Sequence, residues 1–423
     1  MSSREGKQSI RPRHFVIIVY YYSSENVIGS RRWREMSELL TEHGVVTVVC
    51  ADGEPKTKAN SIQVLRVPDE FSGKPDLKQF GERPSNNPII RALKHYGQSV
   101  LFWPDRQRRW ARAAVARLES VLTSGSSNFV ITSGPRFSVH TAMREWLEMK
   151  KPFVQWIMDL RDPWTNDPSP AMRRRSPDFL TRIEARMERS CHHAAYLVTT
   201  VSHVMTMMMK RDFKSPAMTL YNGYAESESA QIADVSSLER YSRSICYLGS
   251  IIHNLRTPQL LFSAARHLKL DLSQIRFEFW SNDPKLIYSE ADRAGVRSLV
   301  TCHGFVPLKE SRSIQLAAGA NLILNGTDSS SDHMITGKAF DHLAARRPVI
   351  AITSASSELR SILETCNCDG IVWDEQSALD VIKRFVEGTL REVRDESRRY
   401  SRKAADEALI GALVGRKELL ERQ

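Results

Sequence analysis

The chain has 423 residues, of which 41% are hydrophobic and 26% are charged, and it carries a formal net charge of +11 at pH 7. This is the composition of an ordinary globular protein rather than of a disordered chain, and its length allows two domains with separate cores. The positive charge favours phosphates, an anionic membrane or nucleic acid as partners, without choosing among them.

Apolar runs of strand length alternate with helical patterns through the first half of the chain. The pattern predicts a strand over 14–22, then a helix over 31–43 with Ser30 as its N-cap and Gly44 just past its C-terminus. The other elements expected in this half are strands at 45–50, 61–67, 128–132, 152–160, 195–201 and 218–221, and helices at 89–122 (broken near Pro104), 139–150 and 178–193. Such a βαβ opening implies a parallel sheet with right-handed crossovers.

Few large apolar residues occur over 225–243, so the boundary between two domains is placed there. The alternation then restarts, with strands expected at 244–250, 275–280, 298–305, 321–325, 349–352 and 370–373, and helices at 257–268, 309–320 and from about 376 onwards. The expected fold class is α/β, with two doubly wound Rossmann-like domains facing a cleft. The expected parts are a first domain over 1–224, a linker over 225–243, a second domain over 244–390, and a helical segment over 391–423 that returns to the first domain.

The stretch 335–352 predicts a loop, a short helix, a basic turn and a buried strand. Gly337 and Lys338 fall where this helix begins, and the unpaired N–H groups of a helix N-terminus favour anions. Asp341 lies one turn further on, so its carboxylate shares a face with the Lys338 ammonium and the pair suits a phosphate and a sugar hydroxyl. The same residues also fit an exposed ion pair worth about a few tenths of a kcal/mol, and the residues alone do not choose between the two.

Several motifs with well-defined chemistry are missing from the sequence. The loops after the two first strands carry only Gly29 and Gly249, which does not make a dinucleotide-binding fingerprint. Gly337-Lys338 lacks the upstream glycine and the following hydroxyl residue of a P-loop. Neither HExxH nor GxSxG occurs, and no residue pattern requires a metal, so no cofactor and no metal are expected.

The six cysteines form no recognisable disulfide framework or zinc pattern, which favours a reduced, cytoplasmic setting. No signal peptide is evident, and no apolar stretch is long enough to cross a bilayer. Membrane contact is therefore expected only as peripheral binding on the inner face of the membrane.

Arginines and aromatic residues interleave over 102–118, around Phe102, Trp103 and Trp110. Such a pattern fits single-stranded nucleic acid, which can stack on the aromatic rings. It equally fits a helix lying on anionic lipid. The third interpretation is a solvated basic face whose aromatic side chains belong to the core. We favour the third interpretation, then the lipid surface, and place nucleic acid last.

A series of short motifs resembles those of GT-B glycosyltransferases, specifically the family 4-like group. The motifs are YYYSSENVIGSRRW, WPDRQRRW, SGPRFSVH and DLRDPW in the first half, and LGSIIHNLRTP, HGFVP and GKAFDHLAARRPVIA in the second. Most follow an expected strand, where open α/β sheets bind ligands. The resemblance covers nearly the whole chain and implies a retaining enzyme that transfers a sugar from a nucleotide donor.

The resemblance also implies roles for individual residues of the second half. Gly249 and Ser250, with Arg256, would contact the diphosphate of the donor. Lys338 would hold the same diphosphate, and Asp341 would bind the ribose hydroxyls.

In the first half, Gly29 and Ser30 would let the first loop approach the donor phosphate or the acceptor. His140 would face the reacting centre, and Asp162 would lie near it, so these two are the implied catalytic residues. Simpler structural roles compete with all these assignments: turn glycines, a loop cap, a buried histidine, and an internal salt-bridge cluster made by Asp159, Arg161 and Asp162.

The base pocket would be lined by the backbone near Phe305 and Val306.

Two departures from the family pattern concern acidic residues. Asp341 stands where many members carry Glu, and His333 stands where they carry another Glu eight residues earlier. The shorter Asp341 requires a closer backbone for ribose contact, and His333 would have to meet the donor sugar in place of a carboxylate.

The sequence therefore predicts a metal-independent hexosyltransferase or a related enzyme that uses a nucleoside-diphosphate sugar. The basic segment suggests a membrane- or lipid-linked acceptor, in polysaccharide or glycoconjugate assembly. The main alternative is a non-catalytic binding or scaffold protein of GT-B shape.

Overall fold

The computed structural model describes residues 12–24, 27–52, 61–69, 103–134, 137–169, 177–225, 241–251 and 256–420. These residues form two compact units. The first comprises the described residues of Met1–Thr165, Arg174–Thr200 and Met207–Met218, and the second those of Asn166–Arg173, Val201–Thr206 and Thr219–Gln423. Most of the predicted linker, and the part of the predicted helix before residue 103, lie outside the described residues.

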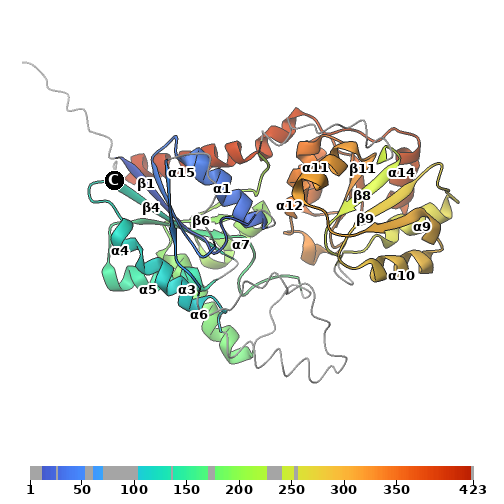
Figure 1. Ribbon diagram of the computed structural model, residues 1–423. Coiled ribbons are helices and arrows are strands. Elements are labelled where there is room, and N and C mark those ends of the chain that lie inside the picture. The colour runs from blue at the N-terminus through green and yellow to red at the C-terminus, as the bar shows by residue number, and fades with distance from the viewer. Residues whose placement is uncertain are drawn as a thin grey trace, which may run out of the picture. The chain divides into compact units, whose positions relative to one another are not determined.

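The first unit is built on a seven-stranded sheet with helices packed against it (Figure 1). The strands follow the order β3-β2-β1-β4-β5-β6-β7, and the neighbouring strands from β3 to β6 all pair in parallel. Their bounds are β1 (Arg13–Ile18), β2 (Val45–Cys50), β3 (Ile62–Arg66), β4 (Ser127–Gly134), β5 (Gln155–Leu160), β6 (Leu197–Thr200) and β7 (Ala217–Thr219). Phe15 to Ile18 are completely buried, as expected for a strand covered on both faces.

The helices of this part of the chain are α1 (Ile28–Leu40), α3 (Arg108–Ala116), α4 (Leu118–Val121), α5 (Ser138–Lys150), α6 (Asp178–Ala194) and α7 (His203–Phe213). Two predicted caps of the first helix are wrong. Ser30 lies inside α1, because this helix begins at Ile28 with Val27 as its N-cap. Gly44 lies beyond the C-cap Thr41, and its role is steric: an added Cβ would lie 2.4 Å from the carbonyl oxygen of Arg13 in β1.

The second unit contains a six-stranded parallel sheet in the order β10-β9-β8-β11-β12-β13 (Figure 1). Its strands are β8 (Ser244–Leu248), β9 (Arg276–Trp280), β10 (Val300–His303), β11 (Ala320–Leu324), β12 (Val349–Ile352) and β13 (Gly370–Val372). A core of aromatic and aliphatic side chains, including Tyr247, Phe262 and Phe277, packs between this sheet and its helices.

The α-helices of the second unit are α9 (Gln259–His267), α10 (Pro284–Ala294), α11 (Leu308–Ala317), α12 (Gly337–Ala345), α13 (Glu358–Thr365), α14 (Glu375–Val386) and α15 (Arg402–Leu420). Short 3-10 turns are η2 (Arg297–Leu299), η3 (Ser329–Ser331) and η4 (Asp395–Tyr400). The predicted helix in 335–352 is confirmed as α12, and Arg346 ends it in the left-handed conformation before Pro348. The α/β fold class with two parallel sheets is confirmed, while the expected cleft and the return of the C-terminal helix stay predictions.

None of the six cysteines forms a disulfide bond. All six cysteines are free thiols, and five of them are buried. Among the described helices, none combines the length and the apolar character needed to cross a membrane.

Candidate functional site

The strand order of each sheet creates a switch point at the first strand of each unit. β1 lies between β2 and β4, and β8 lies between β9 and β11. At such a point the connections leave in opposite directions, and the carboxyl end of the strand is where open α/β sheets bind ligands. The residues after β1 and β8, which include Gly29 and Gly249, therefore stand at the two positions where this architecture favours a site.

In the second unit, Lys338 of α12 lies directly on Gly249. A Cβ atom added to Gly249 would lie 1.4 Å from Nζ and 2.4 Å from Cε of Lys338. Only glycine therefore leaves room for this ammonium group. The ammonium also lies 4.9 Å from the centroid of the Tyr247 ring, which is a cation–π contact.

The charge of Lys338 is not balanced by a direct partner. Its ammonium makes no hydrogen bond or ion pair with any residue that the structure describes. Burial, followed by repulsion from Arg256, lowers the pKa of Lys338 to about 8, while Asp341 acts in the opposite direction. A bound anion would favour the charged form of this amine.

Arg256 adds a second positive charge to the same place. Its Nε is buried and has no hydrogen-bond partner among the described residues. The first turn of α12 begins at Gly337 without a side-chain cap from Thr336, so its N–H groups add positive potential. Two cations beside a helix N-terminus suit an anion with several negative charges, such as a diphosphate.

Ser250 and Asp341 complete this group, which we call the Lys338 site: Gly249, Ser250, Arg256, Lys338 and Asp341. The Tyr247 hydroxyl donates a hydrogen bond to the Ser250 carbonyl oxygen at 2.7 Å, which holds the loop after β8. Asp341 influences the charge of Lys338 and also lines a cavity of about 20 Å³ against α11. The structure thus brings the five predicted residues to one edge of the sheet, and their donor contacts stay predictions.

His333 lies in the loop before α12 and is only 5% exposed. Its Nε2 is 3.6 Å from Oδ1 of Asp167, a residue that the sequence did not single out. The neighbouring Asp332 accepts hydrogen bonds from the hydroxyls of Ser354 and Ser356. Polar contacts thus hold this loop in place. That His333 contacts the donor stays a prediction.

Phe305 and Val306 follow β10. The Phe305 side chain is 80% exposed, and Val306 packs against the apolar cluster that contains Trp280. The His303 ring stacks on Trp280 with centroids 4.5 Å apart, and its Nε2 lies 2.6 Å from Oε2 of Glu278. That the backbone near Phe305 and Val306 lines the base pocket stays a prediction.

In the first unit, Asp159 at the end of β5 forms a buried polar centre. Its carboxylate accepts hydrogen bonds from the side chains of Arg32, Trp33, Ser133 and Thr199. Arg32 and Asp159 are 1% and 0% exposed, so this is a fully buried ion pair. The proposed internal salt-bridge cluster therefore exists around Asp159, but its cation is Arg32 rather than Arg161.

Arg161 instead lies on the first turn of α1. A Cβ atom added to Gly29 would lie 1.9 Å from Nη1 and 2.4 Å from Cζ of Arg161. Ser30, which is completely buried, lines a cavity of about 210 Å³ together with both of these residues and with Val19, Tyr20, Tyr21, Val27, Trp33 and Ser133. We call this the Arg161 cavity; the sequence analysis singled out Gly29 and Ser30 for it, and considered Arg161 only as a member of an internal salt-bridge cluster.

The two predicted catalytic residues occupy different environments. His140, in the first turn of α5, is completely buried, and its Nδ1 lies 2.8 Å from the Thr132 hydroxyl. Burial lowers the pKa of His140 to about 4, so the imidazole is neutral at pH 7. Asp162 is exposed in the loop after β5. Their catalytic roles stay predictions, and for His140 the structure adds the observation that its side chain does not reach solvent.

The basic segment around residue 110 has a buried aromatic side chain and a solvent-exposed basic face. The Trp110 side chain is 2% exposed, and its Nε1 donates to the carbonyl oxygen of Val67 at 2.9 Å. Arg108 and Arg112 are exposed, and Arg112 pairs with Glu145. For the described part of this segment, the arrangement agrees with the interpretation of a solvated basic face with its central aromatic residue in the core.

Comparison with known proteins shows the fold. No family model and no curated protein sequence matches the chain. The E. coli trehalose-6-phosphate protein bound with UDP-2-fluoro glucose aligns with a TM-score of 0.61 and 11% identity, over 95% of this chain and 98% of its own. Sucrose-phosphate synthase of Thermosynechococcus elongatus aligns at 0.60 and 12% identity, over 97% and 100%. WaaG, a glycosyltransferase involved in lipopolysaccharide biosynthesis, aligns at 0.54 and 12%, over 93% of each chain.

The chain has the GT-B fold. These structures are glycosyltransferases of that fold, and the alignments cover nearly all of each chain. At such low identity the likeness concerns architecture, so activity must be argued from the residues of the site itself.

Proposed function

We propose that the protein transfers a sugar from a nucleoside-diphosphate sugar to an acceptor. The observation that carries the proposal is the Lys338 site, where two cations meet an uncapped helix N-terminus at a sheet switch point and the Lys338 ammonium has no ion pair with a described residue. A neutral ligand would leave this charge uncompensated, whereas a diphosphate would neutralise it. The GT-B fold supports the same assignment, and one structural neighbour is bound with a UDP-sugar analogue.

The chemistry follows from where charge develops during transfer. The bond between the anomeric carbon and the diphosphate oxygen breaks, and the new bond forms to an acceptor hydroxyl, which gives up its proton. The departing diphosphate gains negative charge, and Lys338, Arg256 and the α12 N-terminus stabilise it in place. These groups need no rearrangement at the moment of reaction, which is the condition for efficient electrostatic catalysis.

The finer assignments extend this proposal. Asp341 binds the ribose hydroxyls, the loop at Phe305 and Val306 borders the base, and His333 faces the transferred sugar. We propose the retaining outcome of the family 4-like group on the strength of the motif resemblance. Product analysis by NMR tests it, because an inverted anomeric configuration would contradict it.

The roles proposed for the first unit concern the acceptor. Asp162 is the exposed carboxylate near the end of β5 and is proposed to contact the acceptor hydroxyl. His140 is proposed to act as a neutral imidazole from its buried position in α5, because burial lowers its pKa. An activity profile that follows the titration of a histidine near pH 6.5 would contradict this assignment.

Calorimetry with a panel of nucleoside diphosphates and their sugars tests the proposal. We expect one or more of them to bind, with release of nucleotide when an acceptor is present. Lys338→Ala and Arg256→Ala should each weaken binding by about tenfold or more, since a charge-assisted hydrogen bond contributes roughly 1.5–3 kcal/mol. Binding without turnover over a broad acceptor panel would favour the scaffold alternative, and no binding at all would reject the proposal.

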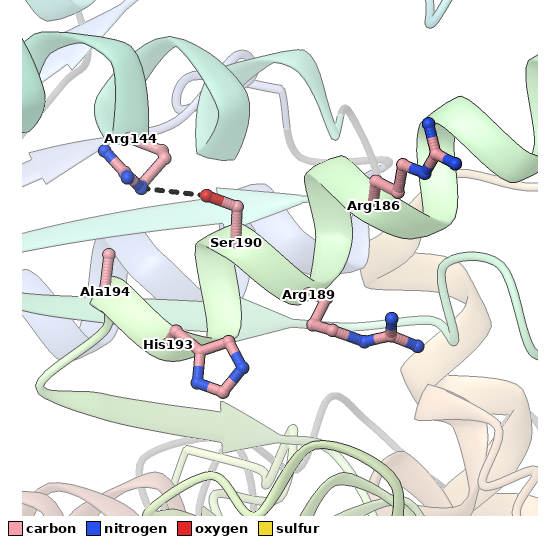
Figure 2. A pocket seen from close by; sticks show the side chains of 6 residues that line it. All are labelled: Arg144, Arg186, Arg189, Ser190, His193 and Ala194. Carbon is pink, nitrogen blue, oxygen red and sulfur yellow. Dashed lines mark hydrogen bonds between the residues drawn. The ribbon is translucent and has the colours of Figure 1, made fainter.

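We further propose that the acceptor lies at an anionic membrane surface. The outer face of α6 presents exposed cationic and apolar side chains at helical spacing, namely Phe179, Arg182, Ile183, Arg186, Arg189 and His193. Figure 2 shows Arg186 and Arg189 extending from α6 beside an open pocket of about 430 Å³, where Arg144 donates to Ser190. Exposed apolar residues among arginines are typical of a helix that lies on anionic lipid.

A further inference from the structure

The open pocket between α5 and α6 lies in the layer of helices that covers the first sheet. One lining residue, Arg144, comes from α5, and the others come from the second half of α6, namely Arg186, Arg189, Ser190, His193 and Ala194. α5 ends just before β5 and α6 just before β6, so both helices end toward the amino edge of the sheet. We call this the α5–α6 pocket; it shares no described lining residue with the Lys338 site or with the Arg161 cavity.

The α5–α6 pocket carries a surplus of positive charge. Three of its six lining residues are arginines, and none of the lining residues that the structure describes is acidic. Arg186 and Arg189 make no hydrogen bond or ion pair with a described residue. Like charges that gather at one place repel each other, so a negatively charged ligand is favoured there.

The carboxylates of α6 do not supply this negative charge, because they are buried and bind the loop after β5. Oε1 of Glu184 accepts a hydrogen bond from the Trp164 indole at 2.8 Å. Oε2 of Glu188 accepts from the backbone N–H of Thr165 at 3.3 Å and from its hydroxyl. Burial raises the pKa of Glu188 to about 7, so this group carries only part of a charge at neutral pH.

Arg144 is held in a fixed orientation at the junction of the two helices. Its Nε donates a hydrogen bond to the Ser190 hydroxyl at 3.0 Å, which Figure 2 shows, and its Nη1 donates to Glu148 at 3.2 Å. Its Nη2 makes no hydrogen bond with a described residue. A planar guanidinium that is fixed at two nitrogens presents its remaining N–H donors in one direction, which lowers the entropy cost of binding an oxyanion.

We propose that the α5–α6 pocket binds a phosphate monoester, with Arg144 as the fixed donor and the exposed Arg186 and Arg189 as further cations. A phosphate monoester carries up to two negative charges and three acceptor oxygens, which suits several guanidinium groups better than a single carboxylate does. The pocket volume of about 430 Å³ also leaves room for the organic group that carries the phosphate.

The proposed source of the phosphate is the headgroup of an anionic lipid. The outer face of α6 continues from Arg186 to Ile183 and Phe179, which are 41% and 56% exposed. Apolar side chains beside arginines enter the acyl region of a lipid layer while the arginines meet its headgroups. That a lipid carries the phosphate rests on the proposed membrane surface, whereas the phosphate site itself does not.

Titration with glycerol 3-phosphate at low ionic strength tests the site. The Lys338→Ala variant is used as background, because it disables the other proposed anion site without changing the pocket. In this background we expect glycerol 3-phosphate to bind, and adding Arg189→Gln should weaken binding by about tenfold or more. Adding Ser190→Ala keeps every charge but removes the hydrogen bond that orients Arg144, so it should weaken binding by about threefold or more.

Arg182→Gln is the matched control for charge. It removes an exposed arginine of α6 that does not line the pocket, so it should leave the affinity for glycerol 3-phosphate nearly unchanged. Equal losses in the Arg182 and Arg189 variants would show that only net charge matters and would overturn the proposal. An affinity that Ser190→Ala leaves unchanged would also overturn it, because the arginines would then act without a built site.

Thermal unfolding separates ligand binding from a structural role of these side chains. Arg189 is exposed and Ser190 is half-buried, so both variants should unfold near the temperature of the parent protein when no ligand is present. Glycerol 3-phosphate should raise the unfolding temperature of the Lys338→Ala parent and raise it less after either substitution. An equal rise in all three proteins would overturn the proposal.

Vesicles distinguish a lipid headgroup from a soluble phosphate monoester. Phosphatidylcholine vesicles are prepared with phosphatidic acid or with phosphatidylserine, matched in surface potential, and co-sedimented with the otherwise unaltered protein. If a lipid supplies the phosphate, binding should be about tenfold tighter to phosphatidic acid, and Ser190→Ala should remove this preference. Equal binding to both vesicles would reject the lipid source, while the losses measured with glycerol 3-phosphate would still support the site even if no nucleotide sugar bound.

Discussion

At the scale of single residues, the chemistry of the Lys338 site depends on one amine held in an unusual state. Burial and Arg256 lower the pKa of Lys338 from 10.5 to about 8. Between these two values the unfolded chain binds more protons than the folded one, so ligand-free stability should rise as the pH increases from about 8 to 10.5. A bound anion favours the charged amine and therefore acts in the opposite direction.

Anion binding should consequently depend on pH. We expect the affinity for pyrophosphate, measured by calorimetry, to fall as the pH rises through about 8, since the amine loses its charge there. A Lys338→Arg variant keeps its charge throughout and should lose this dependence between pH 7 and about 9. A pH profile that is identical in both proteins would show that the titration of Lys338 does not control binding.

Two glycine substitutions should affect different properties, ligand binding in one case and the free energy of unfolding in the other. Gly249→Ala places a Cβ against the mobile end of Lys338, so it should weaken pyrophosphate binding about tenfold while changing the free energy of unfolding little. Gly370→Ala places a Cβ 2.4 Å from the carbonyl oxygen of Val349, which is rigid backbone. It should lower the free energy of unfolding by about 1–3 kcal/mol, measured by urea denaturation, because overpacking against backbone is not relieved by a side-chain movement.

At the scale of elements, Asp159 joins α1 to three strands. It lies at the end of β5 and receives hydrogen bonds from α1, β4 and β6. Ser133 and Trp33, which donate to this carboxylate, also line the Arg161 cavity. The buried network therefore fixes the walls of the cavity.

Asp159→Asn should destabilise the protein strongly. It leaves the Arg32 guanidinium buried without its negative partner, which typically costs about 3–5 kcal/mol in the free energy of unfolding. Glu145→Gln is a matched control, since it breaks the exposed pair with Arg112 and should cost less than about 1 kcal/mol. Comparable urea-denaturation midpoints for the two variants would contradict the central place given to Asp159.

The elements that the sequence predicted well are those with an uninterrupted apolar pattern. The strands from 45–50 to 370–373 are found within a few residues of their expected places, because both faces of a parallel sheet are buried and its strands read as apolar runs. Among the helices that the structure describes, three were not predicted: α7, α10 and α13. α10 carried a usable signal, since Asp283 caps it, Pro284 opens it and Gly295 ends it in the left-handed conformation.

The site was predictable only in part, for a physical reason. Lys338 was singled out because a helix N-terminus is visible in the sequence, whereas Gly249 and Arg256 were singled out by the motif resemblance. The contact of Lys338 with Tyr247, and that of Arg161 with Gly29, depend on side chains that meet across elements. Spacing along one element cannot reveal such contacts, and for Arg161 it indicates only membership of an internal ion-pair cluster.

At the scale of the whole molecule, charge is the property most relevant to partners. The net charge of +11 attracts anionic surfaces in general, but contact at a particular place requires a local cluster. The outer face of α6 combines such a cluster with exposed apolar side chains, including Phe179 at 56% and Ile183 at 41% exposure. This pairing distinguishes α6 from α3, whose large apolar residues Trp110 and Val115 are buried.

Co-sedimentation with vesicles that contain phosphatidylserine tests this surface. Arg186→Glu with Arg189→Glu should reduce binding by about tenfold or more, because each basic residue near such a surface contributes roughly 1 kcal/mol. Lys285→Glu with Arg293→Glu, on exposed positions of α10, makes the same change in net charge and should have a smaller effect. Binding should be strongest at low salt, and equal losses in both double variants would reject a specific role for α6.

The cysteines have a practical consequence. Burial raises the pKa of Cys50 and Cys366 to about 12 and also raises those of Cys191, Cys246 and Cys368, so these thiols rarely form the reactive thiolate. Burial also raises the pKa of Cys302, but Cys302 alone of the six cysteines is partly exposed and so accessible to a reagent. A maleimide dye should therefore modify one thiol per folded molecule, seen as a single mass increment, and six after unfolding. Because Cys302 lies in β10, close in sequence to the proposed base pocket, its label would give a fluorescence signal for donor binding without any engineered cysteine.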